Sequence, residues 1–305
     1  MPARRCLRST IETLIHMAFN RLIQTHLLAL ALTVGGCQTT AHNTVRLPAR
    51  HSVHSDQLLV LSDVQLDKEH PLIADLIQLR KDVGRILELP MKGRPVVVYL
   101  FRDQKNYRRY LHVNYPGLPP RRAYFIGTPD ELAVYTFWGA RIQEDLRHEF
   151  THGLLHSNLR YVPLWLDEGL AECFEVTGPQ PQSINANYAN RLASAMVDGW
   201  RPGLRRLERL ETVREMRRDD YQEAWAWMHY MLNESPDTKE VLLEYLRELR
   251  HAPHPGPLSE RLFQEVPSAD RRLMSYLASI NTFAGETGNQ SVRQTGLSNR
   301  DRAGR

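Results

Sequence analysis

The sequence predicts an α+β fold in which a small mixed sheet, with an edge strand beside a histidine-bearing helix, is followed by an all-helical C-terminal part. Two observations predict it. Apolar runs rich in β-branched and aromatic residues lie between 94 and 139. From residue 143 to residue 281, apolar residues recur at helical spacing instead. The predicted elements near the N-terminus include strands, and those that follow are all helices. This order is typical of an α+β fold.

The first elements are two helices and three strands, and the second helix is a short one through QKNYRRYLH that Asp103 can cap. Pro71 occupies a first-turn position, and apolar residues recur at helical spacing from there to Pro90. Residues 94–101, RPVVVYLF, form an apolar run that predicts a central strand. Two further strands are predicted at AYFIG and ELAVYTFWG, residues 123–127 and 131–139.

The second part of the chain has six helical segments. Gln143 to Ser157 is the first, and the short loop SNLRYVP joins it to the second, Leu164 to Val176. A loop of this length allows the two helices to pack antiparallel. The remaining segments with helical periodicity are 188–198, 220–233, 237–250 and 267–281.

The N-terminus predicts an export signal. The apolar run in HLLALALTVGGCQTT is too short to cross a bilayer, which needs roughly 20 apolar residues, but it suits a signal peptide. Val34–Cys37 resembles a bacterial lipobox, and this resemblance implies lipidation of Cys37. Gln38 in the next position then implies an outer-membrane lipoprotein that faces the periplasm. The alternative is an uncleaved hydrophobic N-terminus of a cytosolic protein, and translation from Met17 would give a signal of ordinary length.

The charge of the chain does not predict a nucleic-acid-binding protein. The net charge is +4, and residues 1–36 contribute +3 of it. The tail from residue 283 onwards contributes another +2, so the middle of the chain carries about −1. A basic phosphate-binding surface is therefore not indicated.

The stretch EDLRHEFTHGLLHS contains the pattern H-E-x-x-H at His148, Glu149 and His152. Residues four apart lie on one face of a helix, so both imidazoles can reach one metal ion. A catalytic zinc ion needs a third protein ligand and one open position. His156 continues the same series but lies a turn too far along the helix to converge, whereas Glu168 on the next helix can face both histidines.

Two motifs together carry a resemblance to a known family. RHEFTHGLL followed by PLWLDEGLAECFE resembles the gluzincin metallopeptidases of the peptidase MA-like superfamily, over about 35 residues from Gln143 to Val176. The resemblance implies that His148, His152 and Glu168 bind Zn²⁺. It further implies that Glu149 is the general base that takes a proton from a zinc-activated water.

Further residues are assigned with alternatives left open. Glu172, one turn past Glu168, is either an acid that orients a ligand histidine or an ordinary solvated carboxylate. Tyr221 is our candidate for the oxyanion-stabilising catalytic residue, and the alternative is a core aromatic. The strand at 131–139 resembles the edge strand along which zincins bind an extended substrate, or it is simply another sheet strand. Cys173 is expected to be a buried, inert thiol.

These observations divide the chain into five segments and predict its function. The segments are a signal peptide (1–36), a lipid anchor and tether (37–56), a zincin-like catalytic domain (57–176), a helical C-terminal part (177–282) and a disordered tail (283–305). The predicted protein is a zinc metallopeptidase, preferably an endopeptidase because FWGAR lacks the glutamate of aminopeptidase signatures. Its expected partners are a peptide or protein substrate and, through the lipid, a membrane. The alternative is a non-catalytic zinc-binding envelope lipoprotein with a structural or scaffolding role.

Overall fold

The structure is a computed structural model that describes residues 46–177, 183–252 and 254–280. The predicted signal peptide, the lipidation site at Cys37 and the predicted tail from residue 283 lie outside the described residues. Within the described ranges, no helix has the length and apolar character needed to cross a membrane.

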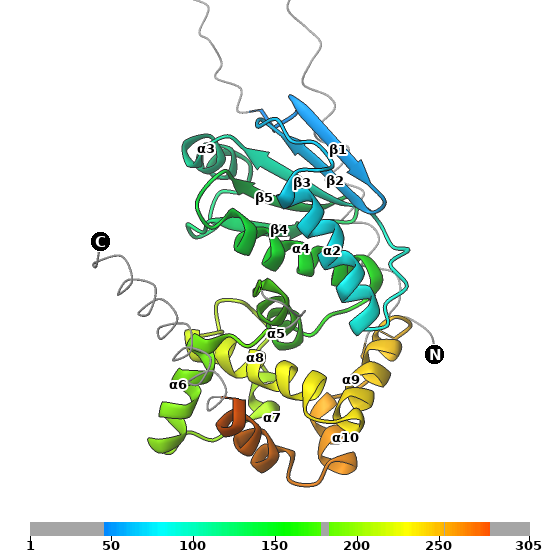
Figure 1. Ribbon diagram of the computed structural model, residues 1–305, viewed down its shortest axis with the longest axis vertical. Coiled ribbons are helices and arrows are strands. Elements are labelled where there is room, and N and C mark those ends of the chain that lie inside the picture. The colour runs from blue at the N-terminus through cyan, green and yellow to red at the C-terminus, as the bar shows by residue number, and fades with distance from the viewer. Residues whose placement is uncertain (1–45, 178–182, 253, 281–305) are drawn as a thin grey trace, which may run out of the picture. The chain divides into compact units, whose positions relative to one another are not determined.

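A five-stranded mixed sheet forms the first part of the fold (Figure 1). The small mixed sheet is predicted from the sequence, but only three of its strands are, because the first two along the chain are missed. Its spatial order is β1 (His51–Ser55), β2 (Leu58–Ser62), β3 (Val96–Phe101), β5 (Leu132–Phe137) and β4 (Ala123–Gly127). The three inner strands run parallel, and each outer strand pairs antiparallel with its neighbour. The apolar strand β3 is central, as expected for a strand that is covered on both faces.

Two features of the sheet differ from the sequence-based expectations. The strand before the histidine helix, β5, is not the edge strand, because it pairs with β3 on one side and with β4 on the other. The edge beside that helix is therefore β4. In addition, β1 lies inside the range 37–56 that the sequence predicts as a tether. Only Val53 of β1 is buried, so an edge strand of this kind carries too little apolar pattern to be recognised.

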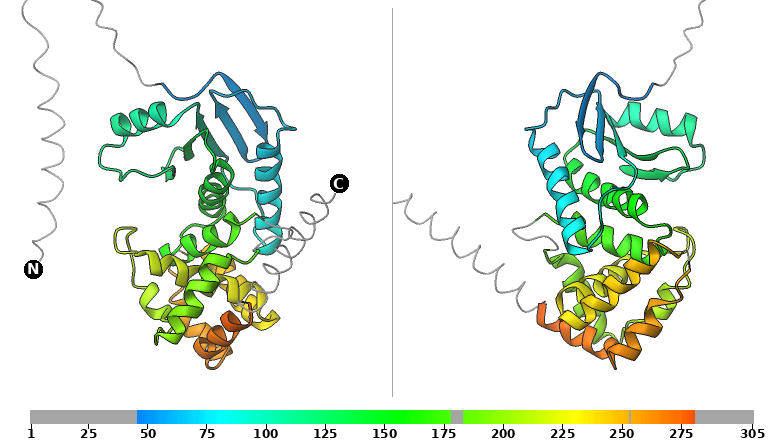
Figure 2. Two further views of the ribbon diagram at one scale, coloured as in Figure 1. Left: turned by 60° about the vertical axis from the view of Figure 1, so that its left-hand side comes forward. Right: turned by 90° about the vertical axis from the view of Figure 1, so that its right-hand side faces the viewer.

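Helices cover both faces of the sheet. Alternate residues of β3 face opposite sides, so Val96, Val98 and Leu100 belong to the core shared with α2 (Pro71–Ile86) and α4 (Ile142–Asn158). Tyr99 and Phe101 pack with aromatic residues of α3 (Gln104–Asn114) on the other face. The histidine helix α4 is therefore held against the sheet beside its β4 edge (Figure 2).

The rest of the described chain is helical, and α5 connects it to α4. α5 (Leu164–Glu175) packs against α4 on one side and α8 (Arg218–Asn233) on the other (Figures 1 and 2). The other helices are α6 (Ala186–Val197), α7 (Leu204–Leu207), α9 (Pro236–Leu249), α10 (Leu258–Glu265) and a helix over 269–280. The predicted helices are confirmed, but α7 and α10 are not among them, because both are short and follow segments containing Pro and Gly.

A glycine sets the close approach of α5 to α8. A Cβ atom at Gly169 would lie 2.6 Å from the backbone oxygen of Ala224 and 2.8 Å from Cγ of Met228. Only a residue without a side chain fits at this contact. The neighbouring residue, Glu168, is thereby held at a defined depth in the structure.

Candidate metal centre and its cleft

The candidate ligands come from two helices that are fixed to each other. His148 and His152 lie one turn apart on α4, and Glu168 lies on α5. Arg147 on α4 is buried and joins the helices: its Nε donates to the backbone oxygen of Phe174 at 2.9 Å. Its Nη1 donates to Asp75 on α2 at 2.8 Å. The relative position of the three candidate ligands therefore depends on contacts that do not involve them.

The three ligand atoms lie at distances that suit one metal ion. Nε2 of His148 is 3.2 Å from Nε2 of His152, and the two nitrogens are 3.5 and 3.6 Å from Oε2 of Glu168. Ligands bound tetrahedrally at 2.0–2.1 Å from zinc are about 3.3–3.4 Å apart. Oε2 of Glu168 is buried and has no hydrogen-bond partner among the described residues, although it faces both imidazoles. A divalent cation would satisfy this atom, so the residues fit the predicted group.

The other nitrogen of each ligand histidine is held by a carboxylate. Nδ1 of His148 lies 3.0 Å from Oε2 of Glu175, and Nδ1 of His152 lies 2.9 Å from Oδ1 of Asp167. Such contacts set the ring orientation and the tautomer of a metal-binding histidine. Neither acid is among the residues predicted from the sequence. For Glu175 a signal existed, since Glu168, Glu172 and Glu175 follow the helical spacing i, i+4, i+7.

Glu172 does not hold a ligand histidine by a hydrogen bond. Its side chain is buried near Glu175 and Tyr188, and its Oε2 has no hydrogen-bond partner among the described residues. Burial, reinforced by the charge of Glu175, raises the pKa of Glu172 to about 8. The contact with His148 that the sequence suggested for Glu172 is made instead by Glu175.

The electrostatics of the cluster favour a cation. Burial opposes protonation of His148, but the carboxylates of Glu168 and Glu175 outweigh it and raise its pKa well above 6.5. For His152, burial is likewise outweighed by Asp167, and its pKa is raised to about 9. The buried carboxylates therefore create a negative potential that either protons or a metal ion can balance.

Glu149 faces the open edge of the sheet. Its Oε2 accepts a hydrogen bond of 2.6 Å from the backbone N–H of Phe125 on β4. Because the opposite side of β4 pairs with β5, this N–H points outward from the sheet. The Phe125 ring also packs on the rings of His152 and His156, with centroids 6.1 and 5.2 Å apart. Phe125 thus links the edge strand to the candidate metal centre, and nothing in the sequence around it indicates this role.

Tyr221 is at the edge of the site rather than in the core. It lies at the start of α8, is half-buried, and forms a side-chain hydrogen bond with Arg121, which precedes β4. Burial and the charge of Glu168 raise its pKa, whereas Arg121 lowers it. Two other aromatic residues of the same helix, His229 and Tyr230, are buried in the core.

Two remaining residues of the sequence analysis have structural neighbours. Nε2 of His156 lies 2.9 Å from Oδ2 of Asp167, so Asp167 contacts both His152 and His156. Cys173 is fully buried, and its Sγ lies 3.7 Å from the backbone oxygen of Trp225. Burial raises the pKa of this thiol well above its usual value.

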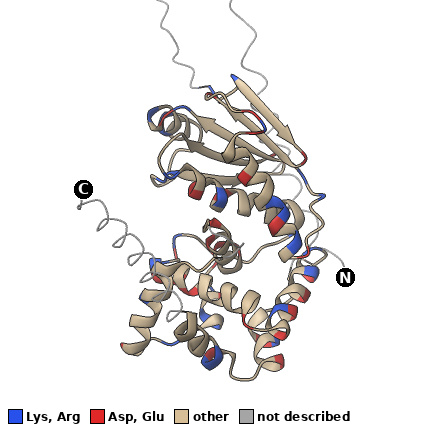
Figure 3. Cartoon of the chain, in the orientation of Figure 1, with Lys and Arg blue, Asp and Glu red and all other residues tan. Residues whose placement is uncertain are grey.

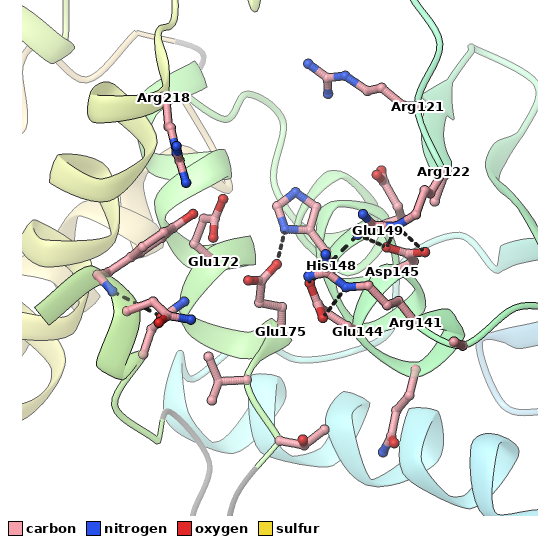
Figure 4. A pocket seen from close by; sticks show the side chains of 18 of the residues that line it. Arg121, Arg122, Arg141, Glu144, Asp145, His148, Glu149, Glu172, Glu175 and Arg218 are labelled. Atoms are coloured by element: carbon pink, nitrogen blue, oxygen red, sulfur yellow. Dashed lines mark hydrogen bonds and ion pairs between the residues drawn. The ribbon is translucent and has the colours of Figure 1, made fainter. Parts of the chain in front are cut away.

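The site opens into a cleft of about 990 Å³. His148, Glu149, Glu172 and Glu175 line one part of it, and the N-terminal residues of α6 and α8 line another. Figure 4 shows His148 in the middle of this cleft, with Glu175 on one side and Glu149 on the other. A molecule in this cleft would therefore lie beside His148 and Glu149 of the candidate metal centre.

Comparisons with known proteins do not assign the chain to a family. No protein-family model matches it, and a search of curated proteins found no match.

Proposed function

We propose that this protein is a zinc-dependent peptidase of gluzincin type, tethered to the cell envelope through Cys37, that hydrolyses peptide or protein substrates. The observation that carries the proposal is the geometry of His148, His152 and Glu168, whose ligand atoms are 3.2–3.6 Å apart. The two helices that the motifs occupy place these atoms together with no rearrangement needed. We further propose endopeptidase activity, because FWGAR (137–141) lacks the glutamate with which aminopeptidases bind the substrate amine.

The chemistry divides between the metal and the protein. A bound Zn²⁺ ion supplies a Lewis acid that polarises the scissile carbonyl and lowers the pKa of water. Glu149 is the general base: its Oε2 is held by the Phe125 N–H, which leaves Oε1 to take a proton from the attacking water. The same atom then passes the proton to the leaving amine. To Tyr221, at the start of α8, we assign donation of a hydrogen bond to the carbonyl oxygen as negative charge develops there.

The edge of β4 is the proposed binding site for the substrate backbone. The N–H of Phe125 is bonded to Glu149, so an extended peptide that pairs with the other outward backbone groups of this edge would run past the general base. In this arrangement, main-chain hydrogen bonds hold the substrate while side chains alternate between the cleft and solvent.

A second candidate function is a non-catalytic zinc-binding protein. The observation that favours it is the 2.6 Å hydrogen bond between Glu149 and Phe125, because a general base engaged by the backbone has one less free oxygen. In that case the zinc ion would hold α4 and α5 together and would not catalyse a reaction.

The decisive experiment compares the full chain, purified in detergent, with Glu168→Ala and Glu149→Gln. We expect about one zinc ion per chain in the wild type by elemental analysis, and strongly reduced zinc in Glu168→Ala. Glu149→Gln should keep its zinc and lose the cleavage of unfolded casein that the wild type shows, by about 10²-fold or more. Zinc binding without any cleavage by the wild type would favour the non-catalytic function. Absence of zinc from the wild type would refute both.

A further inference from the structure

The cleft beside the metal centre has an uneven distribution of charge. Every Lys or Arg that lines it is an arginine, and these are Arg108, Arg121, Arg122, Arg141, Arg191 and Arg218. Arginine outnumbers lysine throughout this chain, so the residue type alone carries no information. The positions of the arginines and their partners are informative.

Two of these arginines are engaged by acids at the start of α4. Nη2 of Arg122 is 2.6 Å from Asp145, and Arg141 pairs with Glu144. Figure 4 shows both pairs on the same side of the cleft. Their guanidinium groups are neutralised within the protein and are not available to a ligand.

Arg121 has no such partner. Within the described part of the chain it forms no ion pair, and its guanidinium lies 5.9 Å from the centre of the Tyr124 ring and is hydrogen-bonded to Tyr221. Burial lowers its pKa, but Tyr221 and the more distant charges of Glu168 and Glu149 outweigh this and raise it. Arg121 is therefore an exposed cation without an ion-pair partner in the described chain, close enough to Glu149 and Glu168 to feel their charges.

The three remaining arginines of the cleft, Arg108, Arg191 and Arg218, also form no ion pair among the described residues, and Arg218 extends from the opposite wall. Arg218 is the first residue of α8 and forms no ion pair with any acid that the structure describes. In Figure 4, Arg218 and Arg121 extend into the cleft from opposite sides, with His148 between them in this view. The open side of the candidate metal centre is thus flanked by positive charge that the protein itself does not neutralise.

We infer that the cleft selects peptides with a carboxylate beside the scissile bond, and that Arg121 is the residue that binds this carboxylate. The inference rests on the proposed peptidase function and adds the class of substrate to it. A guanidinium presents two parallel N–H donors that match the two oxygens of a carboxylate. Arg121 precedes β4, along whose edge we place the substrate backbone, so a residue of that substrate close to Glu149 can reach it.

The carboxylate can come from two sources, an Asp or Glu side chain or the C-terminus of the peptide. Arg218 raises the local concentration of either by its charge. On binding, Arg121 exchanges its hydrogen bond with Tyr221 for the carboxylate. Because the guanidinium donates in that hydrogen bond, the Tyr221 O–H is available to donate to the scissile carbonyl both before and after the carboxylate binds.

The test measures binding, in the catalytically inactive background Glu149→Gln with zinc bound. The probes are fluorescent neutral peptides of about ten residues, long enough to span the cleft as a strand. In one series a single Glu occupies each position in turn, and in the matched series Gln replaces it. A third pair contains no acidic side chain and differs only in a free or amidated C-terminus.

We expect the Glu peptide to bind about tenfold or more tightly than its Gln partner at one or two neighbouring positions. Adding Arg121→Gln should abolish this difference, and Arg121→Lys should restore only part of it. Arg109→Gln, which removes an exposed arginine of α3 outside the cleft, is the matched control and should leave the difference unchanged. A tenfold effect in the third pair alone would identify the C-terminus as the source.

Three results would overturn the inference. Glu and Gln peptides bound within about twofold at every position, with no effect of C-terminal amidation, would exclude carboxylate recognition. An equal loss of affinity for both series in Arg121→Gln would give Arg121 a structural role only. No binding of any peptide would also reject it. Casein cleavage that depends on Glu149 would still support the peptidase function in each case, so the two failures are distinguishable.

Discussion

Two neighbouring acids on α5, Glu172 and Glu175, differ in what they contact. Glu175 holds Nδ1 of His148 at 3.0 Å, whereas Glu172 lies close by without a hydrogen bond to that ring. We therefore predict that Glu175→Gln weakens zinc affinity by about 10–100-fold, because the ligand histidine loses the carboxylate that orients it. Glu172→Gln should weaken it far less. Competition with a chromogenic chelator at fixed pH measures both, and a larger effect of Glu172→Gln would contradict the assignment.

The same pair of residues shows how far the sequence can predict the site. His148, His152 and Glu168 follow from helical spacing and from the short loop between two helices, and the structure brings their ligand atoms together. The supporting contacts depend on the rotation of α5 about its own axis. Spacing along the sequence does not determine whether Glu172 or Glu175 then faces His148. Phe125 and Arg121 are further still from prediction, since their roles require knowing which strand forms the edge.

Among the helices, the contact of α5 with α8 is the most sensitive to a change in size. We predict that Gly169→Ala lowers the free energy of unfolding by about 1–3 kcal/mol, although alanine is the better helix former. The added Cβ would meet the backbone oxygen of Ala224 at 2.6 Å, and backbone atoms cannot rotate away. Denaturant unfolding measures the change. An unchanged or increased stability would show that α5 and α8 do not approach this closely.

The start of α10 is stabilised from outside that helix. Its N-cap residue, Pro257, makes no side-chain cap, and Glu208, just after α7, instead accepts hydrogen bonds from the backbone N–H and the hydroxyl of Ser259. Burial raises the pKa of Glu208 above its ordinary value of 4.5, although the bonds from Ser259 oppose this. The Glu208 carboxylate therefore binds its proton more tightly in the folded protein than in the unfolded chain.

This raised pKa predicts a pH dependence of stability. The stabilisation that comes from the raised pKa is fully present below the unfolded value and is lost as pH rises through the folded pKa. We expect the wild type to lose stability relative to Glu208→Gln as pH rises above 4.5, because glutamine does not titrate. Denaturant unfolding of both proteins at a series of pH values measures the difference. A difference that stays constant with pH would show that Glu208 titrates normally.

At the level of elements, the sequence predicts whether a segment is a helix or a strand better than it predicts which strands lie side by side. The helix and strand periodicities hold because each reflects burial of one face. Strand order is different: β5 and β4 look equally suited to an edge, and only pairing with β3 decides between them. β1 is missed for a related reason, since hydrogen bonds to β2 rather than an apolar face hold it in the sheet.

For the molecule as a whole, the candidate metal centre lies where its two main parts meet. α4 packs on the sheet, and α5 packs on the C-terminal helices, so an ion bound by His148, His152 and Glu168 would join both. The charged residues elsewhere are dispersed, with acids and bases interspersed over the helices (Figure 3). The buried carboxylates are therefore concentrated at this junction. A cation that neutralises their charge should affect the stability of the whole fold.

We predict that zinc stabilises the entire described domain in a single transition. A free zinc concentration about 100-fold above Kd adds about 2.7 kcal/mol, or about 5–10 °C in Tm for a domain of this size. Glu168→Ala should remove the zinc-dependent shift, because the ligand set is incomplete, whereas the exposed α3 substitution His112→Ala should keep it. Thermal unfolding followed by circular dichroism, with zinc or a chelator, provides the measurement. An equal shift in Glu168→Ala would place the stabilising ion at another site, and two separate transitions would mean that the sheet and the C-terminal helices unfold independently.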